Sequence, residues 1–303
     1  MDIKKIIMND RDIKENSVNA YIISLKKLND NKDITSVEFL KETNKIQKKL
    51  DELALTTRKN RLTAILVFLR AVGGHEKLIE HYGELLSKYT DEYFSIVPKN
   101  EKSEKEEKNW ATLKELNKVM KDYEKEIKER GIKQKNKLTP KERVLLQNYL
   151  VTSLYLLIPP RRLDYNVKVV KKRSEIKDGD NYLLNETKTK KKFIIQDFKT
   201  VKSHGVQEFD VPKKLNSVIN LSRQFNNSEF LLVNNRGGRL SDNGLGKLIK
   251  KAFAPTKKEI TLNLLRKITI SENVDMEAVK KSKKLAEEMN HSVKMQQTVY
   301  FKD

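Results

Sequence analysis

Residues 181–211, NYLLNETKTKKKFIIQDFKTVKSHGVQEFDV, interrupt a chain whose other periodic segments have helical spacing. Three short stretches within them are rich in aromatic and β-branched residues, and turns bearing Gly or Asn separate these stretches. The pattern predicts a three-stranded antiparallel sheet formed by Asn181–Asn185, Lys192–Lys199 and Val206–Pro212.

The sequence around this sheet predicts helices. Thr139 as N-cap, Pro140 in the first turn and Glu142 three residues after the cap indicate the start of an apolar helix that stops at Pro159-Pro160. Other helices are expected over residues 110–131, 212–225, 241–253, 261–272, 276–289 and 293–300. We therefore expect residues 110–303 to form one α-rich domain with a small sheet.

Residues 1–98 are expected to form a separate helical domain, so the fold class is mainly α. Ser17 is the expected N-cap of its first long helix, Gly73-Gly74 stops a later one, and a further helix is expected from His75 to Lys88. Between the domains, residues 99–109 (KNEKSEKEEKN) hold four lysines, four glutamates and no apolar side chain. That composition is typical of a solvated linker.

The charge of the chain points to a phosphate-bearing partner. Its 303 residues carry 63 Lys and Arg against 42 Asp and Glu, a formal net charge of +21. Residues 1–98 hold 17 basic and 15 acidic side chains, whereas residues 110–303 hold 42 and 23. Nucleic acid is the expected partner, and an anionic membrane is the weaker alternative.

Several classes of protein are excluded by composition. The absence of cysteine excludes disulfide scaffolds, thiolate zinc sites, iron–sulfur clusters and cysteine nucleophiles. Four histidines make a multi-histidine metal site improbable, so no metal and no cofactor is expected. The apolar runs are too short to span a bilayer and the N-terminus lacks a secretory signal, so we expect an intracellular protein without membrane contact.

Five polar residues of the second domain form a set suited to metal-free phosphoryl transfer. They are Arg161, Lys199, Arg266, His291 and Tyr300. A tyrosine hydroxyl is a nucleophile that yields a covalent phosphodiester. Arginine forks stabilise the non-bridging oxygens, and a lysine protonates the leaving oxygen.

The order and spacing of these residues resemble those of the tyrosine recombinases, the integrase family that shares its catalytic fold with type IB topoisomerases. Arg161 and Asp164 match the family's arginine and the acidic residue three positions later, on a helix start. Lys199 matches the lysine of the family's β2–β3 hairpin, and Asn263-Leu-Leu-Arg266 matches the H-x-x-R box.

The resemblance extends to both ends of the chain. Asn290-His291-Ser292 is similar to the family's G-H-S motif, and Tyr300 follows His291 by nine residues, as the nucleophile does in the family. Residues 17–74 resemble the family's helical core-binding domain, so the likeness covers nearly the whole chain.

This resemblance implies a mechanism. Tyr300 attacks the scissile phosphate to give a 3′-phosphotyrosyl link, and Lys199 protonates the 5′ oxygen. Arg161, Arg266 and His291 stabilise the pentacoordinate phosphate, and Asp164 holds the Arg161 guanidinium. Neither ATP nor metal is needed. The resemblance also implies that the two domains clamp duplex DNA and that a homotetramer recombines two sites.

Asn263 departs from the family pattern because it replaces the histidine of the H-x-x-R box. Asparagine donates a hydrogen bond but carries no charge, so Asn263 is expected to be a sixth catalytic residue in a weakened supporting role, with slower chemistry.

Six further basic residues are expected to contact the DNA backbone. They are Arg58, Lys59, Arg61, Arg162, Lys202 and Lys267. Arg162 competes with Arg161 for one catalytic role, and Lys202 competes with Lys199 for another. Spacing favours Arg161 and Lys199 as the catalytic members. His75, His81 and His204 are interpreted as structural or surface residues, with His204 close to the turn that follows Lys199.

Two alternatives to a recombinase remain open. One is another enzyme with the same intermediate, either a type IB topoisomerase or a telomere resolvase. The other is a DNA-binding protein that has lost catalysis, with Asn263 as the first sign. The abundance of Lys, Asn and Ile suggests an AT-rich genome such as that of a virus or mobile element. The expected location is with DNA, in a prokaryotic cytoplasm, a nucleus or a viral factory.

Overall fold

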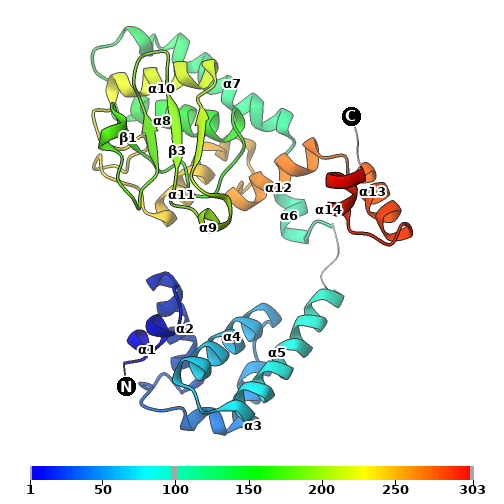
Figure 1. Cartoon of the computed structure of the whole chain (residues 1–303). Helices are drawn as coiled ribbons and strands as arrows, with labels where there is room; N and C mark the ends of the chain where they lie inside the picture. The colour runs from blue at the N-terminus through cyan, green and yellow to red at the C-terminus, as the bar shows by residue number, and fades with distance from the viewer. Residues whose placement is uncertain (1, 97–100, 301–303) are drawn as a thin grey trace. The chain divides into compact units, whose positions relative to one another are not determined.

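The computed structural model describes residues 2–96 and 101–300, and the chain divides into two compact units, Met1–Glu101 and Lys102–Asp303 (Figure 1). The division falls inside the segment predicted to be a linker. Within that segment, α6 (Glu104–Asn109) is a helix with no buried residue, opened by a capping box between Ser103 and Glu106. Because this box and the acidic first turn stabilise a helix start, the charged sequence is helical here instead of extended.

The first unit is built from helices, as the sequence predicts. They are α1 (Ile3–Asp10), α2 (Glu15–Leu28), η1 (Glu38–Lys41), α3 (Thr43–Asp51), α4 (Leu55–Val72) and α5 (Glu76–Ile96). Helix α4 packs against α1, α2 and α5 and buries the run 64–69, so it is the core of the unit. Gly73 ends α4 with φ 77°, as expected. The prediction of Ser17 as N-cap is wrong, because α2 begins at Glu15 and its N-cap is Lys14.

The second unit surrounds α8 with helices. Its helical elements are α7 (Leu113–Glu129), η2 (Ile132–Gln134), α8 (Pro140–Leu156), η3 (Arg173–Glu175), α9 (Val201–His204), α10 (Lys213–Phe225), α11 (Asp242–Ala252), η4 (Ala254–Thr256), α12 (Leu262–Asn273), α13 (Met276–Glu288), α14 (Val293–Met295) and η5 (Gln296–Tyr300). The predicted capping box of Thr139 and Glu142 is present at the start of α8. This helix is buried along most of its length and packs against α7, α10 and α11.

The sheet has four strands and is mixed, so the prediction of three antiparallel strands is wrong. Its strands are β1 (Lys168–Val170), β2 (Tyr182–Leu184), β3 (Lys192–Ile195) and β4 (Gln207–Asp210), in the order β1-β2-β3-β4. The last three are antiparallel, as predicted, whereas β1 is parallel to β2. The sequence gives no signal for β1, because the strand is three half-buried residues at the start of a basic run. Its pairing with β2, more than ten residues later in the chain, defines it as a strand.

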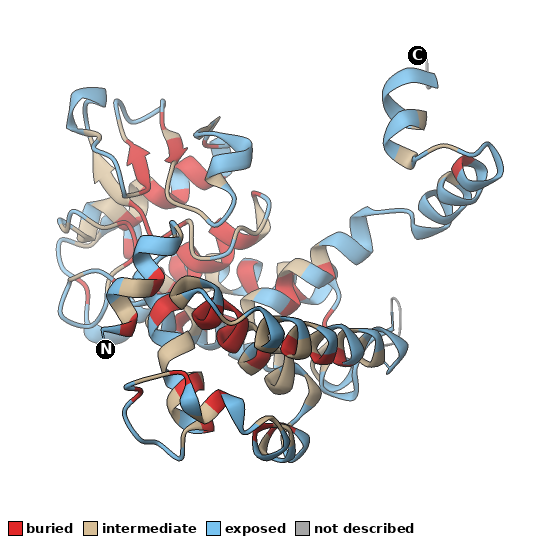
Figure 2. Cartoon of the chain, turned by 60° about the horizontal axis from the view of Figure 1, so that its bottom comes forward, coloured by how far each residue is buried: buried red, intermediate tan, exposed pale blue. Residues whose placement is uncertain are grey.

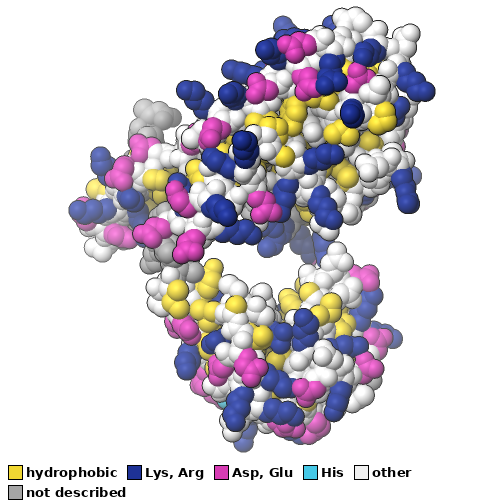
Figure 3. Space-filling model, turned by 180° about the vertical axis from the view of Figure 1, so that it is seen from behind, with side chains coloured by type: hydrophobic (Ala, Val, Ile, Leu, Met, Phe, Trp, Pro, Cys, Tyr) yellow, Lys and Arg dark blue, Asp and Glu magenta, His cyan; other side chains and the backbone are white. Residues whose placement is uncertain are grey.

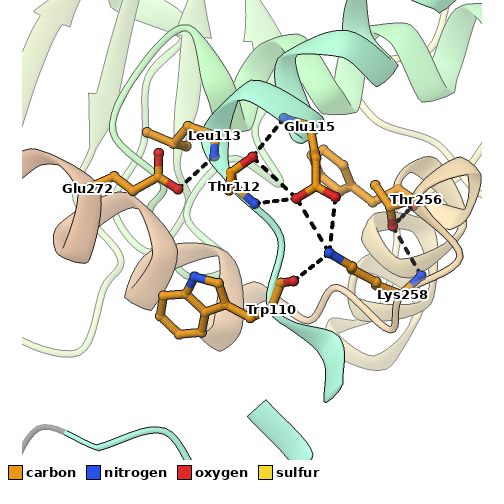
Figure 4. Close-up of polar contacts among 8 residues, drawn as sticks. Trp110, Thr112, Leu113, Glu115, Thr256, Lys258 and Glu272 are labelled. Atoms are coloured by element: carbon orange, nitrogen blue, oxygen red, sulfur yellow. Dashed lines mark hydrogen bonds and ion pairs between the residues drawn. The ribbon is translucent and has the colours of Figure 1, made fainter. Parts of the chain in front are cut away.

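The start of the second unit is fixed to α12 and the turn before it (Figure 4). Lys258 Nζ donates hydrogen bonds to the Trp110 carbonyl (2.6 Å) and the Glu115 carboxylate (3.1 Å). The Leu113 amide donates to the Glu272 carboxylate at 2.9 Å. These contacts anchor α12 at both ends and hold it against the body of the unit.

The final segment, α13–η5, is exposed (Figure 2). Ala286 is the buried residue of α13, while Val279, Leu285 and Met289 expose about half of their surface. In Figures 1 and 2 the segment lies beyond α12, away from the sheet. Across residues 2–96 and 101–300, no helix combines the length and apolar character needed to cross a membrane.

Candidate functional site

The segment after α8 is held in a tight turn that carries Arg161. Tyr165 Oη donates a hydrogen bond to the Pro159 carbonyl (2.7 Å), and Tyr155 Oη donates to the Arg162 carbonyl (3.0 Å). Residues 161–165 form bends and a turn, so the expectation of a helix start at Arg161 is wrong. The two prolines break the helix, and the buried phenols fix the irregular backbone in its place.

The Arg161 guanidinium is half-buried between a carboxylate and two aromatic rings. Its Nη1 lies 3.8 Å from Asp164 Oδ2, and its Cζ lies 5.2 Å from the ring centroid of Phe209 and 6.0 Å from that of Phe198. Burial raises the pKa of the Asp164 carboxyl, and the charges of Arg161 and Arg266 oppose that shift. Contacts on several sides therefore restrict where the guanidinium lies.

Asn181 joins this turn to the end of β3. Its Nδ2 donates hydrogen bonds to the carbonyls of Asp164 (3.3 Å) and Asp197 (2.9 Å). Its Oδ1 accepts hydrogen bonds from the amides of Gln196 (2.9 Å) and Asp197 (2.7 Å). The backbone that leads to Lys199 is thereby fixed relative to the Arg161 turn. Sequence reasoning missed this role, since an asparagine before a strand gives no signal of its distant partners.

These segments and α12 enclose a cavity of about 510 Å³. Its charged and titratable lining residues are Arg161, Arg162, Asp164, Lys199, His204 and Arg266. Lys199 comes from the connection between β3 and β4, the hairpin position predicted for it. Four basic side chains and one partly buried carboxylate line the cavity, so it is suited to an anion.

Asn263 does not join this group, although it lies three residues before Arg266. The hydroxyl of the N-cap Thr261 accepts from the Leu264 amide, and Leu264 and Leu265 are buried against the core. With that face inward, Arg266 lines the cavity while Asn263 is exposed and is not a lining residue. Of the two residues, Arg266 lines the cavity and Asn263 does not, and that they serve one catalytic site stays a prediction.

His291 and Tyr300 lie together, but they do not line the cavity. Asn290 adopts φ 55° after α13, and the amides of Asn290 and His291 donate to the carbonyls of Glu287 and Ala286. This is a Schellman end, which turns the chain back. The His291 and Tyr300 rings stack with centroids 5.1 Å apart. Both His291 ring nitrogens are buried and have no hydrogen-bond partner within the described part of the chain.

Two of the basic residues predicted to contact DNA pack against their own unit. Arg58 donates hydrogen bonds to the carbonyls of Asp51 and Leu53, both at 2.8 Å. Lys59 Nζ lies 4.3 Å from the ring centroid of Tyr93. The structure thus assigns Arg58 a role in holding α4 to the turn before it.

The other predicted DNA contacts are spread over both units. Burial lowers the pKa of Arg61, and Lys267 forms an ion pair with Glu106 of α6. Arg162 is exposed at the cavity, and Lys202 is exposed on α9. Figure 3 shows Lys and Arg side chains over the visible face of each unit, with Asp and Glu between them. Within residues 2–96 and 101–300, no three His, Asp or Glu side chains gather as a metal site requires.

Comparisons with known proteins found a likeness to solved structures. No protein-family model matches the chain, and no curated protein matches it. Among solved structures, a crystal structure of a lambda integrase dimer bound to a COC′ core site is similar, with a TM-score of 0.46 and 14% sequence identity. The similarity covers 88% of this chain and 85% of that chain. A score and an identity this low assign neither a family nor an activity.

Proposed function

We propose that this chain is a DNA strand transferase of the tyrosine recombinase type, acting on specific sites in duplex DNA. The observation that carries the proposal is the meeting of Arg161, Lys199 and Arg266 in one cavity. Three segments far apart in the sequence supply them, and these are residues that the motif resemblance assigns to phosphate chemistry. Two guanidinium forks and an ammonium group match the oxygens of a phosphodiester.

The proposed reaction needs no cofactor. The Tyr300 hydroxyl gives up its proton to water as its oxygen attacks phosphorus, the bond from phosphorus to the 5′ oxygen breaks, and Lys199 supplies the proton to that leaving oxygen. Arg161 and Arg266 stabilise the charge on the non-bridging oxygens. A 5′-hydroxyl from the same or another strand then reverses the step, so one phosphodiester replaces another. Exchange between two duplexes requires paired sites, for which we propose a homotetramer.

Cleavage requires that Tyr300 reach the cavity, and we propose that α13–η5 moves there as one piece. Ser282 Oγ donates a hydrogen bond to Gln296 Oε1 at 3.1 Å, which ties η5 to α13. The segment exposes apolar side chains, and the ring nitrogens of His291 have no hydrogen-bond partner among the described residues. Both features support a second position for the segment. His291 would arrive together with Tyr300.

One observation favours a second candidate, a DNA-binding protein without cleavage. Tyr300 and His291 are outside the cavity, and Asn263 is exposed, so three of the six residues assigned to catalysis are not assembled. Under this alternative the cavity holds a backbone phosphate and no adduct forms.

A nicked suicide duplex separates the two candidates. DNA that flanks the chain's own gene is cut into overlapping duplexes, each nicked so that cleavage releases a short strand and traps the adduct. We expect a denaturation-resistant complex with the wild-type chain, none with Tyr300→Phe, and normal yield with the control Tyr21→Phe. Binding in a mobility-shift assay without any adduct would favour the binding-only candidate. Strand exchange between two duplexes would identify a recombinase, whereas relaxation of supercoiled DNA would identify a topoisomerase.

A further inference from the structure

His204 lies in the cavity with a fixed backbone. It is the last residue of α9, and its amide donates to the Thr200 carbonyl at 3.1 Å. Gln207 Nε2 donates to the His204 carbonyl at 2.9 Å, and Gly205, with φ 66°, ends the helix. His204 is exposed, in keeping with the surface position expected from the sequence, and it lines the cavity with Lys199 and Arg266.

The neighbours of His204 favour contact with an anion. Facing the cavity from the Arg161 turn are Arg161, Arg162 and Asp164, from the β3–β4 connection Lys199, and from α12 Arg266, while Lys202 shares α9 with His204. The arginines and lysines stay charged across the physiological range, whereas histidine is the side chain that changes charge between about pH 5 and 8. A phosphate that enters this lining offers oxygens that can accept an N–H hydrogen bond from the imidazole.

This chain has no histidine at position 263, whereas His204 lines the cavity. The resemblance assigns a phosphate-contacting histidine to position 263, but this chain has an exposed asparagine there that does not line the cavity. His291 is also outside the lining. Among the histidines of the described residues, His204 is thus the one that lines the cavity with Arg161, Lys199 and Arg266.

We propose that His204 is a catalytic residue whose imidazolium donates an N–H hydrogen bond to a non-bridging oxygen of the phosphate held by Arg161, Lys199 and Arg266. This rests on the proposed function, because the phosphate is the scissile one of DNA. No bond is made or broken by His204, and its contribution is a charged hydrogen bond.

Histidine-selective NMR tests the contact without any need for cleavage. The chain has four histidines, so single His→Gln variants assign every imidazole resonance. The probes are inorganic phosphate and a short mixed-sequence duplex, with chloride at matched ionic strength as reference. With either probe, the titration of His204 is expected to move to higher pH, whereas the titrations of His75 and His81 are expected to stay in place. The Arg266→Ala variant should remove the effect on His204. If neither probe changes the pH at which His204 titrates, the proposal is overturned.

The trapping assay tests the catalytic consequence. His204→Gln keeps an N–H donor but loses the charge, so adduct formation is expected to slow by roughly 10- to 100-fold near pH 6.5. Its pH dependence between about pH 6 and 8 should flatten. Ser203→Ala, the neighbouring residue of α9, is the matched control and should react like wild type. Equal rates for His204→Gln and wild type overturn the proposal. If the wild-type chain forms no adduct, the proposed function is wrong. The NMR titration then decides whether His204 contacts a phosphate in the cavity.

Discussion

Replacing Asn181 by alanine removes the side chain that joins the Arg161 turn to the approach to Lys199. Four hydrogen bonds disappear, two donated by Nδ2 to carbonyls and two accepted by Oδ1 from amides, with lengths from 2.7 to 3.3 Å. Asn181 is buried, with 7% of its surface exposed, so water replaces these bonds poorly. At a net value of about 1 kcal/mol for each bond, and less for the longest, the expected loss in free energy of unfolding is about 3 kcal/mol.

Urea unfolding measures that loss, and the suicide-duplex assay measures its effect on the site. Asn181→Asp keeps the two accepted bonds but sets a carboxylate oxygen against the carbonyls of Asp164 and Asp197, so it should also destabilise the fold. Asn185→Ala, in the half-buried segment after β2, is the control and should cost less than about 1 kcal/mol. The adduct yield should fall for both Asn181 variants at temperatures where they remain folded. A loss below about 1 kcal/mol for Asn181→Ala would refute the role assigned to this side chain.

Three further outcomes are expected. A hydrogen bond from Lys135 and the N-cap contacts lower the pKa of Glu142 to about 2. Its stabilisation is therefore complete above the ordinary value of 4.5 and is lost as pH falls toward about 2, so the urea midpoint of wild type should drop more in that range than that of Glu142→Gln. A parallel decline of the two midpoints would contradict this. Lys191 is buried and its Nζ donates to four oxygens, so Lys191→Met should lose about 2–4 kcal/mol in urea unfolding, and a loss under 1 kcal/mol would show the bonds to be unimportant. Arg161→Lys keeps the charge but not the fork, so adduct formation should slow roughly 10- to 100-fold with stability nearly unchanged, whereas an unchanged rate would remove Arg161 from the reaction.

Local signals in the sequence predicted the helices well. Thr139, Ser241 and Thr261 are N-caps in the structure at the starts expected from the sequence, because a cap is decided by residues within one turn. Ser17 failed because α2 begins at Glu15, three residues before the start that an N-cap at Ser17 implies, and its N-cap is a lysine that makes no side-chain cap.

The sheet and the site depended on contacts that the sequence does not show. Strand β1 exists because its backbone pairs with β2, and no alternation within three residues signals it. Arg161, Lys199 and Arg266 could be chosen from the motif order, and the structure brings them to one cavity. His204 and Asn181 could not be chosen, because their importance comes from where the β3–β4 connection folds back. The sequence also could not predict that Tyr300 lies outside the cavity. The spacing between His291 and Tyr300 gives their separation along the chain but not the path of α13–η5.

The most direct test of the proposed chemistry is mass spectrometry of the trapped complex. After nuclease and protease digestion, we expect one nucleotide-bearing peptide, carrying a phosphotyrosine ester at Tyr300 with the nucleotide joined through its 3′ oxygen. A nucleotide on any other residue, or a link through the 5′ oxygen, would contradict the proposed chemistry.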